Sequence, residues 1–410
     1  MVKTSSKIYF VGGLFPEYVY DDIINASRGV VQYAADSLQK SILVGLSELV
    51  DDCEIVNLPF IGSYPMRFRK LFIRTTKFDF TSGGKTIKGE NVRFVNLTGY
   101  KLYSRYKSLR HFLREKISSL KENRGVVLLV YSVHTPFLKA CVEVKKENPN
   151  VRIIQIVPDL PEFMSPKKTK FRSLCERYNS KIQCKLYEAV DGYVLLSKYM
   201  SEKIPVNGKP WVVMEGIYNE VEDFEIHESS SNEKYILYTG TLAKRYGILN
   251  LVKAFRLCKD LKCKLYICGD GDARSEIIQQ ANIDKRIIYC GQVKREYAIK
   301  LQKKATLLVN PRTPEGDFTK FSFPSKTMEY LASGIPTLLY MLPGIPEEYY
   351  KYCFCLSDMS ILALADKIKE IISMDERTLK EKGKKAREFI LKEKSPYKQV
   401  SKIVSLINNL

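Results

Sequence analysis

Several residue types and patterns are scarce in this chain of 410 residues, and each scarcity narrows its function. The chain has three histidines, and none of its ten cysteines forms a C-x-x-C pair. Zinc sites and disulfide frameworks normally need such clusters, so we expect a reduced protein with no metal site. Cys353 and Cys355 alternate along a strand-like segment, and we expect their side chains to face opposite ways.

Long apolar runs are also missing. The longest, such as Val126 to Val130, fall far short of the ~20 residues that span a bilayer. The N-terminus is polar and does not resemble a secretory signal peptide. We therefore expect a cytoplasmic protein, with any membrane contact peripheral and at the inner face.

Acidic residues are outnumbered: 66 lysines and arginines face 46 aspartates and glutamates, for a net charge of +20. Between Arg67 and Arg124, sixteen basic residues face four acidic ones. Such a stretch attracts lipid headgroups, nucleic acid or a phosphorylated substrate. A solvated basic helix face explains the same pattern, and the sequence leaves both readings open.

Apolar runs alternate with helical periodicity along the whole chain. The first series of expected strands is Ile8–Val11, Cys53–Leu58, Val92–Leu97, Val126–Tyr131, Arg152–Val157 and Tyr193–Leu196. The second series is Tyr235–Thr239, Lys264–Cys268, Ile287–Cys290, Leu307–Asn310 and Pro336–Tyr340. Long helices are expected at Asn25–Leu49 and Lys101–Asn123, the latter with Arg105, Arg110, Arg114 and Lys121 on its basic face.

This alternation predicts an α/β protein with two Rossmann-like, doubly wound parallel sheets. We expect an N-terminal domain at residues 1–217, a C-terminal domain at 218–375, and terminal helices at 376–410 that pack back toward the first domain. Ligands of such folds bind at the carboxyl ends of the strands, so we expect a site in a cleft that the two domains face.

Glycines follow three of the expected strands. They are Gly12 and Gly13, then Gly240, then Gly269 and Gly271. Glycine there lets the backbone turn sharply and come close to a phosphate or a sugar, although many α/β loops contain one for geometry alone. None matches the full G-x-G-x-x-G pattern, which disfavours a dinucleotide cofactor. We expect no cofactor.

The segment from Phe323 to Pro336 predicts a phosphate-binding helix. Pro324 and Ser325 suit a helix start, where the serine can cap free N–H groups. Lys326 lies in the first turn, where the helix dipole disfavours a cation unless an anion also binds. Glu329, one turn on, can accept two hydroxyls from a ribose. A plain capped helix with exposed Lys326 and Glu329 is the alternative.

Three segments resemble the donor domain of the retaining glycosyltransferases of family 4, which have the GT-B fold. They are YTGTLAKRYGILNLVKAF, LYICGDGDARSEI and SFPSKTMEYLASGIPTL, and they span about Tyr235 to Tyr340 in the order of that family. The resemblance implies diphosphate binding by Thr241 to Arg245 and by Ser325 and Lys326. It also implies nucleoside contacts near Gly269 to Asp272 and ribose binding by Glu329.

Two departures from the family pattern concern the donor sugar. The family commonly has a glutamate eight residues before Glu329, and Phe321 stands there; Glu315, Asp317 and Arg312 are the neighbouring candidates to replace it. The usual arginine and lysine of the glycine loop fall on Thr241 and Tyr246, so Lys244 and Arg245 are the expected substitutes.

Two polar residues in the N-terminal half follow expected strands. His134 lies where the family often has a histidine beside the donor sugar, although a lone histidine is more often structural. Asp159 could contact the acceptor or remove its proton. A second basic loop contains Lys167, Lys168, Lys170 and Arg172.

We therefore expect a metal-independent glycosyltransferase that moves a sugar, most simply from a UDP-sugar, to a lipid-linked or polysaccharide acceptor of a bacterial surface glycan. Lys326, Glu329 and His134 are the expected catalytic residues, with Lys244 or Arg245 assisting Lys326 at the leaving diphosphate. An anionic membrane is the expected partner surface. The alternatives are a nucleotide-sugar epimerase of GT-B fold and a protein that binds nucleic acid or an anionic surface, although no nucleic-acid motif is present.

Overall fold

The computed structural model describes residues 4–120, 125–160, 179, 181–220 and 233–410, and the chain divides into two compact units. Unit 1 consists of Met1–Ile217 together with Pro396–Leu410, and unit 2 consists of Tyr218–Ser395. Residues 221–232 and the second basic loop with Lys167 to Arg172 lie outside the described residues. The same is true of Lys121.

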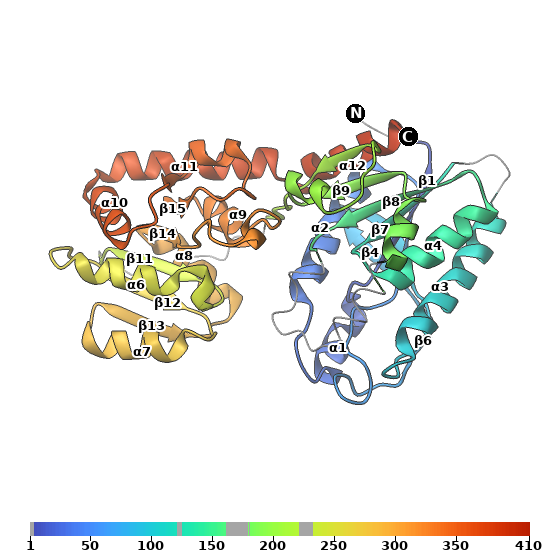
Figure 1. Ribbon diagram of the computed structural model, residues 1–410, viewed down its shortest axis with the longest axis horizontal. Coiled ribbons are helices and arrows are strands. Elements are labelled where there is room, and N and C mark those ends of the chain that lie inside the picture. The colour runs from blue at the N-terminus through green and yellow to red at the C-terminus, as the bar shows by residue number, and fades with distance from the viewer. Residues whose placement is uncertain (1–3, 121–124, 161–178, 180, 221–232) are drawn as a thin grey trace. The chain divides into compact units, whose positions relative to one another are not determined.

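Unit 1 is built around an eight-stranded sheet with helices on its faces (Figure 1). Its strands, in the order β10-β9-β8-β7-β1-β2-β5-β4, are parallel except for β4, which pairs antiparallel with β5. The strands of the sheet are β1 (Lys7–Gly12), β2 (Cys53–Asn57), β4 (Thr76–Ser82), β5 (Lys85–Asn91), β7 (Val126–Tyr131), β8 (Val151–Val157), β9 (Gly192–Leu195) and β10 (Trp211–Val213). A separate two-stranded ribbon pairs β3 (Phe72–Ile73) with β6 (Phe94–Val95). In the described residues, its helices include α1 (Tyr20–Ala26), α2 (Tyr33–Leu49), α3 (Lys101–Ser118), α4 (Thr135–Glu147) and α12 (Pro396–Asn408), with short 3-10 turns η1 (Glu17–Val19) and η3 (Lys198–Glu202).

Unit 2 repeats this plan with a six-stranded parallel sheet in the order β13-β12-β11-β14-β15-β16. Its strands are β11 (Tyr235–Thr239), β12 (Lys264–Cys268), β13 (Ile287–Gly291), β14 (Leu307–Asn310), β15 (Thr337–Tyr340) and β16 (Phe354–Leu356). Its helices are α6 (Ile248–Leu257), α7 (Arg274–Ile283), α8 (Arg295–Lys304), α9 (Ser325–Ala332), α10 (Ile361–Ser373) and α11 (Glu376–Glu393), with 3-10 turns η4 (Lys244–Tyr246), η5 (Asp317–Thr319) and η6 (Glu347–Tyr352).

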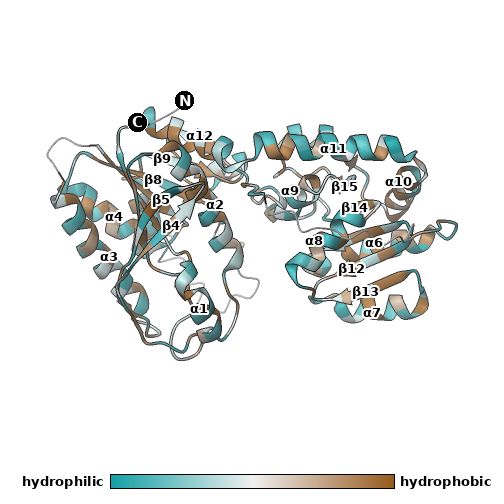
Figure 2. Cartoon of the chain, turned by 180° about the vertical axis from the view of Figure 1, so that it is seen from behind, coloured by the Kyte–Doolittle hydropathy of each residue, from teal (hydrophilic) through white to brown (hydrophobic). Residues whose placement is uncertain are grey.

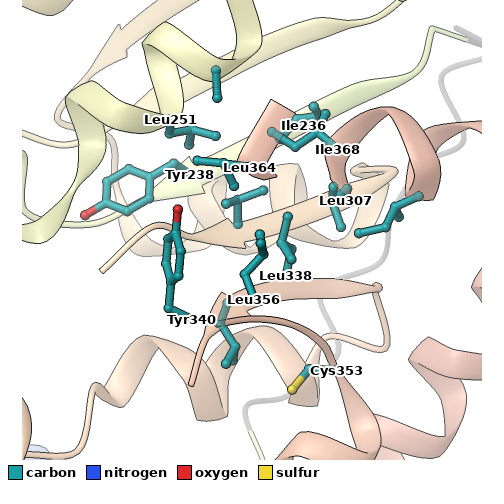
Figure 3. Close-up of a cluster of buried hydrophobic side chains, with 14 of the residues drawn as sticks. Ile236, Tyr238, Leu251, Leu307, Leu338, Tyr340, Cys353, Leu356, Leu364 and Ile368 are labelled. Atoms are coloured by element: carbon teal, nitrogen blue, oxygen red, sulfur yellow. The ribbon is translucent and has the colours of Figure 1, made fainter. Parts of the chain in front are cut away.

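The core of unit 2 forms where helices cover the sheet. Figure 3 shows Ile236 and Leu307 from neighbouring strands beside Leu364 and Ile368 of α10. All four side chains are buried, so the near-continuous apolar strands are explained by burial between layers. Figure 2 shows the corresponding contrast in hydropathy between β13, which is mostly hydrophobic, and α11, which is mostly hydrophilic.

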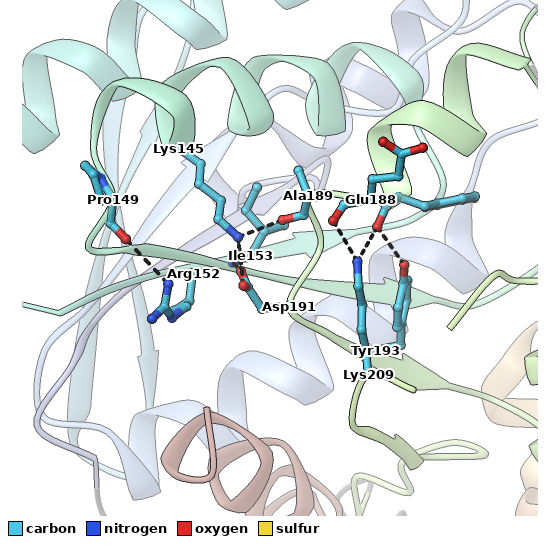
Figure 4. A network of polar contacts seen from close by, with 10 residues as sticks. Lys145, Pro149, Arg152, Ile153, Glu188, Ala189, Asp191, Tyr193 and Lys209 are labelled. Atoms are coloured by element: carbon cyan, nitrogen blue, oxygen red, sulfur yellow. Dashed lines mark hydrogen bonds and ion pairs between the residues drawn. The ribbon is translucent and has the colours of Figure 1, made fainter. Parts of the chain in front are cut away.

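A polar network fixes one edge of the unit 1 sheet (Figure 4). Lys145 of α4 donates to both carboxylate oxygens of Asp191, at 2.7 and 2.6 Å. Asp191 also accepts the backbone N–H of Ile153 at 2.7 Å, which ties α4 to β8 and to the start of β9. Such a charge-assisted pair at a strand end holds the outer strands in register.

The α/β class with two Rossmann-like parallel sheets and C-terminal helices is confirmed, but several local predictions were wrong. The segment Val92–Leu97 forms only the short β6, and the sheet is continued instead by β5 from the polar hairpin β4–β5. The helix expected from Asn25 begins at Tyr33, and the basic helix ends at Ser118. In the described part of the chain, no helix is long and apolar enough to cross a membrane.

Cys353 and Cys355 do not face opposite ways. Cys353 precedes β16 rather than belonging to it, and its Sγ lies 3.6 Å from that of Cys355. Strict alternation holds only between residues that are both in the strand. The prediction therefore failed because the strand begins one residue later than expected.

Candidate functional site

The candidate site of unit 2 lies where its strand order reverses. The chain builds outward from β11 to β12 and β13 on one side, and from β14 to β16 on the other. Loops that follow the two central strands diverge at such a switch point, and ligands of open α/β sheets bind there. β11 ends at Thr239 and β14 at Asn310, so the segments after these residues frame the site.

The glycines after β11 and β12 allow their loops to pack against each other. A Cβ on Gly269 would lie 1.9 Å from the carbonyl oxygen of Gly240, and one on Gly271 would lie 2.5 Å from that of Leu242. The backbone N–H of Leu242 donates to the Asp270 carbonyl at 2.9 Å across the same contact. Close approach of two backbones therefore explains Gly269 and Gly271 without any ligand.

Two arginines meet around a pair of aromatic rings near the switch point. The Arg312 guanidinium lies 4.5 Å from the ring centroid of Phe318 and 5.3 Å from that of Tyr246. The Arg245 guanidinium lies 5.4 and 5.1 Å from the same two rings. Stacking of this kind holds guanidinium groups in place without neutralising them.

Arg312 is buried, with 8% of its surface exposed. It donates to the Ser322 hydroxyl at 2.8 Å, and its Nε has no hydrogen-bond partner. Burial lowers the pKa of Arg312, and the like charge of Arg245 contributes to this. Among the residues that the structure describes, no carboxylate pairs with either arginine. A bound anion would supply the missing partner.

Lys244 and Thr241 point elsewhere. The Lys244 ammonium forms an ion pair with Glu276 of α7 at 2.5 Å, and its backbone N–H donates to Asp272 at 2.8 Å. The exposed Thr241 uses its carbonyl to accept the Tyr238 hydroxyl at 2.9 Å. Of the predicted pair Lys244 and Arg245, the structure places only Arg245 beside Arg312.

The first turn of α9 carries no side-chain cap. Its N-cap residue is Pro324, which has no side-chain oxygen, and the exposed Ser325 is the first helical residue rather than the cap. The expectation that Ser325 caps the helix is therefore not met. The free N–H groups of this turn keep the partial positive charge that attracts anions. Gly334 follows the C-cap residue of this helix and has a φ of 78°, the left-handed conformation common just after a helix end.

Lys326 and Glu329 do lie together. The Lys326 ammonium donates to Glu329 Oε1 at 2.8 Å, and the Gln302 amide donates to the same oxygen at 2.6 Å. Gln302 also donates to the Thr239 hydroxyl at 2.9 Å, which ties α8 and α9 to the end of β11. The carboxylate is therefore held in a fixed orientation and only partly buried, as a group that binds a diol must be.

Phe321, which stands in place of a family glutamate, is a buried core residue. Two of the three neighbouring candidates to replace that glutamate, Glu315 and Asp317, are exposed, and Glu315 accepts the Thr313 hydroxyl at 3.2 Å. Arg312 is the third candidate, and its guanidinium stacks on Phe318 and Tyr246.

In unit 1 the corresponding switch point lies between β1 and β7. The N–H of Gly13 donates to Gln39 Oε1 at 2.8 Å, and a Cβ on Gly12 would lie 2.5 Å from that same oxygen. A Cβ on Gly13 would lie 2.6 Å from the Phe60 ring. Tight packing of α2 and of the loop after β2 therefore explains both glycines.

His134 is the N-cap residue of α4, just after β7. Its ring centroid lies 4.4 Å from that of Phe137 and 5.8 Å from that of Phe60. Burial lowers the pKa of His134 well below its usual value, and the charges of Arg105 and Lys101 lower it further, so the ring is neutral at pH 7. Ser132, two residues before it, has a φ of 73°, a conformation that is costly for a residue other than glycine.

Asp159 follows β8 as predicted and is exposed.

Sequence reasoning missed the residues that complete these sites, because nothing local marks them. Tyr246, Phe318 and Gln302 become significant only when distant segments meet, and Arg105 reads as one more cation of a basic helix. The residues missed in this way are Tyr246, Gln302 and Phe318 in unit 2, and Phe60, Lys101 and Arg105 in unit 1.

Comparison with protein families bears on what unit 2 does. Residues 219–389, nearly all of unit 2, match the family model described as glycosyl transferases group 1. Unit 2 is therefore a glycosyltransferase domain, and the chain is a glycosyltransferase. No curated protein matches the chain.

Solved structures of GT-B type match the fold over nearly its whole length. Sucrose-phosphate synthase from Thermosynechococcus elongatus has a TM-score of 0.63 and 14% identity, covering 98% of each chain. HepE from Anabaena, solved in complex with UDP, has a TM-score of 0.59 and 14% identity, covering 98% of this chain and 100% of its own. A UDP-forming trehalose-phosphate synthase from Burkholderia xenovorans has a TM-score of 0.61 and 12% identity, covering 98% of this chain and 99% of its own. At these identities the likeness shows the GT-B fold alone.

Proposed function

We propose that this glycosyltransferase takes its sugar from a UDP-sugar bound by unit 2 and passes it, with retention at the anomeric carbon, to an acceptor bound by unit 1. The observation that carries the proposal is Arg312, a buried arginine at the switch point whose charge no described carboxylate neutralises. A diphosphate is the anion that best fits two adjacent guanidinium groups and a nearby uncapped helix.

The donor is held at both of its ends. Arg312 and Arg245 bind the diphosphate together with the first turn of α9, and Arg312 donates to Ser322 in the segment just before that helix. Glu329, fixed by Lys326 and Gln302, accepts the ribose hydroxyls with its remaining oxygen. Lys326 lies in the first turn, so its charge adds to that of the helix end.

Departure of the diphosphate is the step that this arrangement assists. Negative charge grows on the leaving phosphate as the sugar bond breaks, and fixed cations at that position lower the barrier. The same cations remove the need for a metal, so activity should survive treatment with EDTA. His134, neutral at pH 7, serves as a hydrogen-bonding wall of the acceptor site rather than as a charge.

The structural neighbours support the donor and the stereochemistry. HepE was solved with UDP, and the Burkholderia enzyme is described as UDP-forming. A trehalose-6-phosphate synthase of the same fold is described in terms of glycosyl transfer with retention. These properties belong to those proteins, and we extend them to this chain because its own cations occupy the switch point.

Calorimetric titration with UDP tests the donor site. Arg312→Gln should weaken UDP binding about 10- to 100-fold, since a charge-assisted hydrogen bond contributes roughly 1.5–3 kcal/mol. Arg377→Gln, on an exposed position of α11, is the matched control and should bind like the unchanged protein. Equal affinities in both variants would remove the basis of the proposal.

The acceptor, we propose further, is a lipid-linked glycan of the bacterial surface, reached from an anionic membrane at the cytoplasmic face. The basic face of α3 is not the contact. Arg110 and Arg114 pair with Glu143 and Glu147 of α4, and Arg105 is buried. The exposed cations lie instead in the segment around β3, as Arg67, Arg69, Lys70 and Arg74.

Exposed apolar side chains accompany these cations. The bridge between Tyr64 and Leu97 and the pairing of β3 with β6 join the segment to the start of α3. The exposed large side chains of this surface are Met66, Phe72, Leu97, Tyr100, Leu102 and Tyr103. Aromatic and aliphatic groups mixed with cations suit the interface of an anionic bilayer.

Flotation with vesicles tests this surface. Leu102→Ser combined with Tyr103→Ser should reduce binding to vesicles that contain phosphatidylglycerol and leave UDP binding unchanged. Ile278→Ser, an exposed apolar residue of α7 in unit 2, is the control. Unchanged flotation of the double variant would exclude this surface as the membrane contact.

A further inference from the structure

Unit 1 contains a second group of cations without counter-charges. Lys101 and Arg105 lie one turn apart on α3, and His134, at the N-cap position of α4, lies beside them. Arg105 is 1% exposed, and its guanidinium lies 4.6 Å from the ring centroid of Phe94. Among the largest fully buried side chains it is the one that carries a charge.

Neutral carbonyls are the partners of both cations. Arg105 donates to the Pro59 carbonyl, and the Lys101 ammonium donates to the Ile61 carbonyl at 2.7 Å. Arg105 Nε and His134 Nδ1 are buried without a partner. No carboxylate in the described part of the chain pairs with any of the three. Burial and the charges of Arg105 and Arg67 lower the pKa of Lys101 to about 7, the behaviour of an uncompensated cation.

Three cations further along α3 do have carboxylate partners. One to three turns further along, Arg110 and Arg114 have carboxylate partners on α4, and Lys116 pairs with Glu54 of β2 at 3.1 Å. The cations at the start of the helix are therefore left unpaired against the trend of their own element. Uncompensated buried charge costs free energy and is kept where it has a use.

The end of α4 adds to the same positive field. This helix has 13 residues, and its N-cap residue His134 makes no side-chain cap hydrogen bond. Pro136 has no N–H and the Phe137 N–H donates to the His134 carbonyl at 2.9 Å, so the first turn offers the Thr135 N–H and the partial positive charge of the helix end. Its first turn follows β7, at the switch point of the unit 1 sheet, where a ligand of this unit is expected. The strained Ser132 directs the chain into this turn. Two cations and an uncapped helix end thus converge at one strand end.

We propose that Lys101 and the N-terminal turn of α4 bind a phosphoryl group of the acceptor, with Arg105 as a buried positive charge behind them. The inference rests on the proposed function and names the chemistry of its acceptor. A phosphoryl dianion neutralises both cations, whereas a carboxylate neutralises one and leaves the other buried and unpaired. The phosphoryl group belongs either to a phosphorylated sugar or to a lipid phosphate.

Sulfate tests the site itself, because its charge does not titrate between pH 6 and 9. The background is Arg312→Gln, which removes the anion site of unit 2. Added sulfate, matched for ionic strength with chloride, should raise the unfolding temperature more at pH 6.5 than at pH 8.5. In this range Lys101 loses its proton, while Arg105, whose burial lowers its pKa to about 9, stays mostly charged and His134 stays neutral.

Lys101→Met is the deciding variant and Lys107→Met, on an exposed position of the same helix, is its control. Lys101→Met should weaken the sulfate response at least 10-fold and abolish its pH dependence, and Lys107→Met should change neither. Methionine suits this half-buried position, so the variant is expected to fold. A sulfate response equal in both variants would overturn the site.

Two further arms assign the source of the phosphoryl group. Glucose 6-phosphate is titrated for the sugar source and vesicles containing phosphatidate for the lipid source, each against Lys101→Met. Binding of either probe that depends on Lys101 supports the proposal, and binding of neither overturns it. UDP binding distinguishes the phosphoryl site from the proposed function. Lys101→Met should bind UDP like the unchanged protein. If the unchanged protein did not bind UDP, only the proposed function would be contradicted.

Discussion

At the residue scale, Lys101 makes stability depend on pH in a direction that can be worked out. Its pKa is about 7 in the folded protein against 10.5 as its ordinary value, so the unfolded chain binds more protons between these values. The free energy of unfolding should therefore rise as the pH is raised from 7 toward 10 and fall again as the pH is lowered to 7.

The comparison of Lys101→Met with the unchanged protein isolates this effect. From pH 7 to pH 9 the free energy of unfolding of the unchanged protein should rise by roughly 2 kcal/mol relative to that of Lys101→Met. A full shift is worth about 1.4 kcal/mol per pH unit, and solvent screening reduces it. Urea unfolding at several pH values measures it. Parallel pH profiles for the two proteins would mean that Lys101 keeps an ordinary pKa.

Glu329 gives a prediction that depends on the nucleoside rather than on the phosphate. If its carboxylate accepts the ribose hydroxyls, Glu329→Gln should weaken UDP binding about 5- to 20-fold and 2′-deoxy-UDP binding much less. Calorimetry with both ligands separates this contact from general damage to the site. An equal loss for both nucleotides would place Glu329 away from the ribose.

The residues of the donor site could be predicted from sequence only in part. Lys326 and Glu329 lie within one helix, so their spacing already placed them together. Arg312 was one of three candidates, and its burial was decided by Phe318 and Tyr246, which come from other segments. Lys244 was expected to assist and instead pairs with Glu276, because α7 brings a carboxylate that local spacing does not reveal.

At the scale of elements, Gly383 shows how closely α11 packs on the end of α9. A Cβ at this position would lie 1.9 Å from the carbonyl oxygen of Gly334. In an exposed helix, Gly→Ala stabilises by about 1 kcal/mol. Here the clash should reverse the sign, so Gly383→Ala should destabilise unit 2 by roughly 2 kcal/mol or more.

Thermal unfolding of Gly383→Ala beside Gly84→Ala provides the measurement. Gly84 has a φ of 75° with nothing within 4 Å of its Cβ position, so its variant carries backbone strain of about 1 kcal/mol without a clash. A Gly383→Ala protein as stable as the unchanged one would show that α11 can move away from α9.

Elements with strong patterns were predicted well, and those held by long-range contacts were not. Buried parallel strands such as β7 and β11 begin and end where their apolar runs do. The hairpin β4–β5 has polar, partly exposed strands, and only pairing along β2 makes β5 part of the sheet. Periodicity cannot detect pairing between residues far apart in sequence.

At the scale of the whole molecule, the chain returns to its first unit at its end. Pro396–Leu410 belong to unit 1, where α12 packs against α2, while α11 belongs to unit 2. Val400, Ile403 and Val404 of α12 are fully buried in the unit 1 core. A sequence shows a terminal helix of this kind but not the partner that its apolar face will cover.

Removal of Pro396–Leu410 should therefore unfold unit 1 and spare unit 2. Burial of each large apolar side chain contributes about 1.5–3 kcal/mol, so losing several exceeds much of the 5–15 kcal/mol that stabilises a typical domain. The shortened chain should keep a calorimetric transition that UDP shifts upward, because Arg312 and Glu329 both lie in unit 2. It should lose the sulfate response that depends on Lys101.

Ile403→Ala, compared with the exposed-face change Ser401→Ala, should produce a weaker form of the same selective loss. If the shortened chain kept both responses, α12 would be dispensable for unit 1, and if it lost both, the two units would not fold independently.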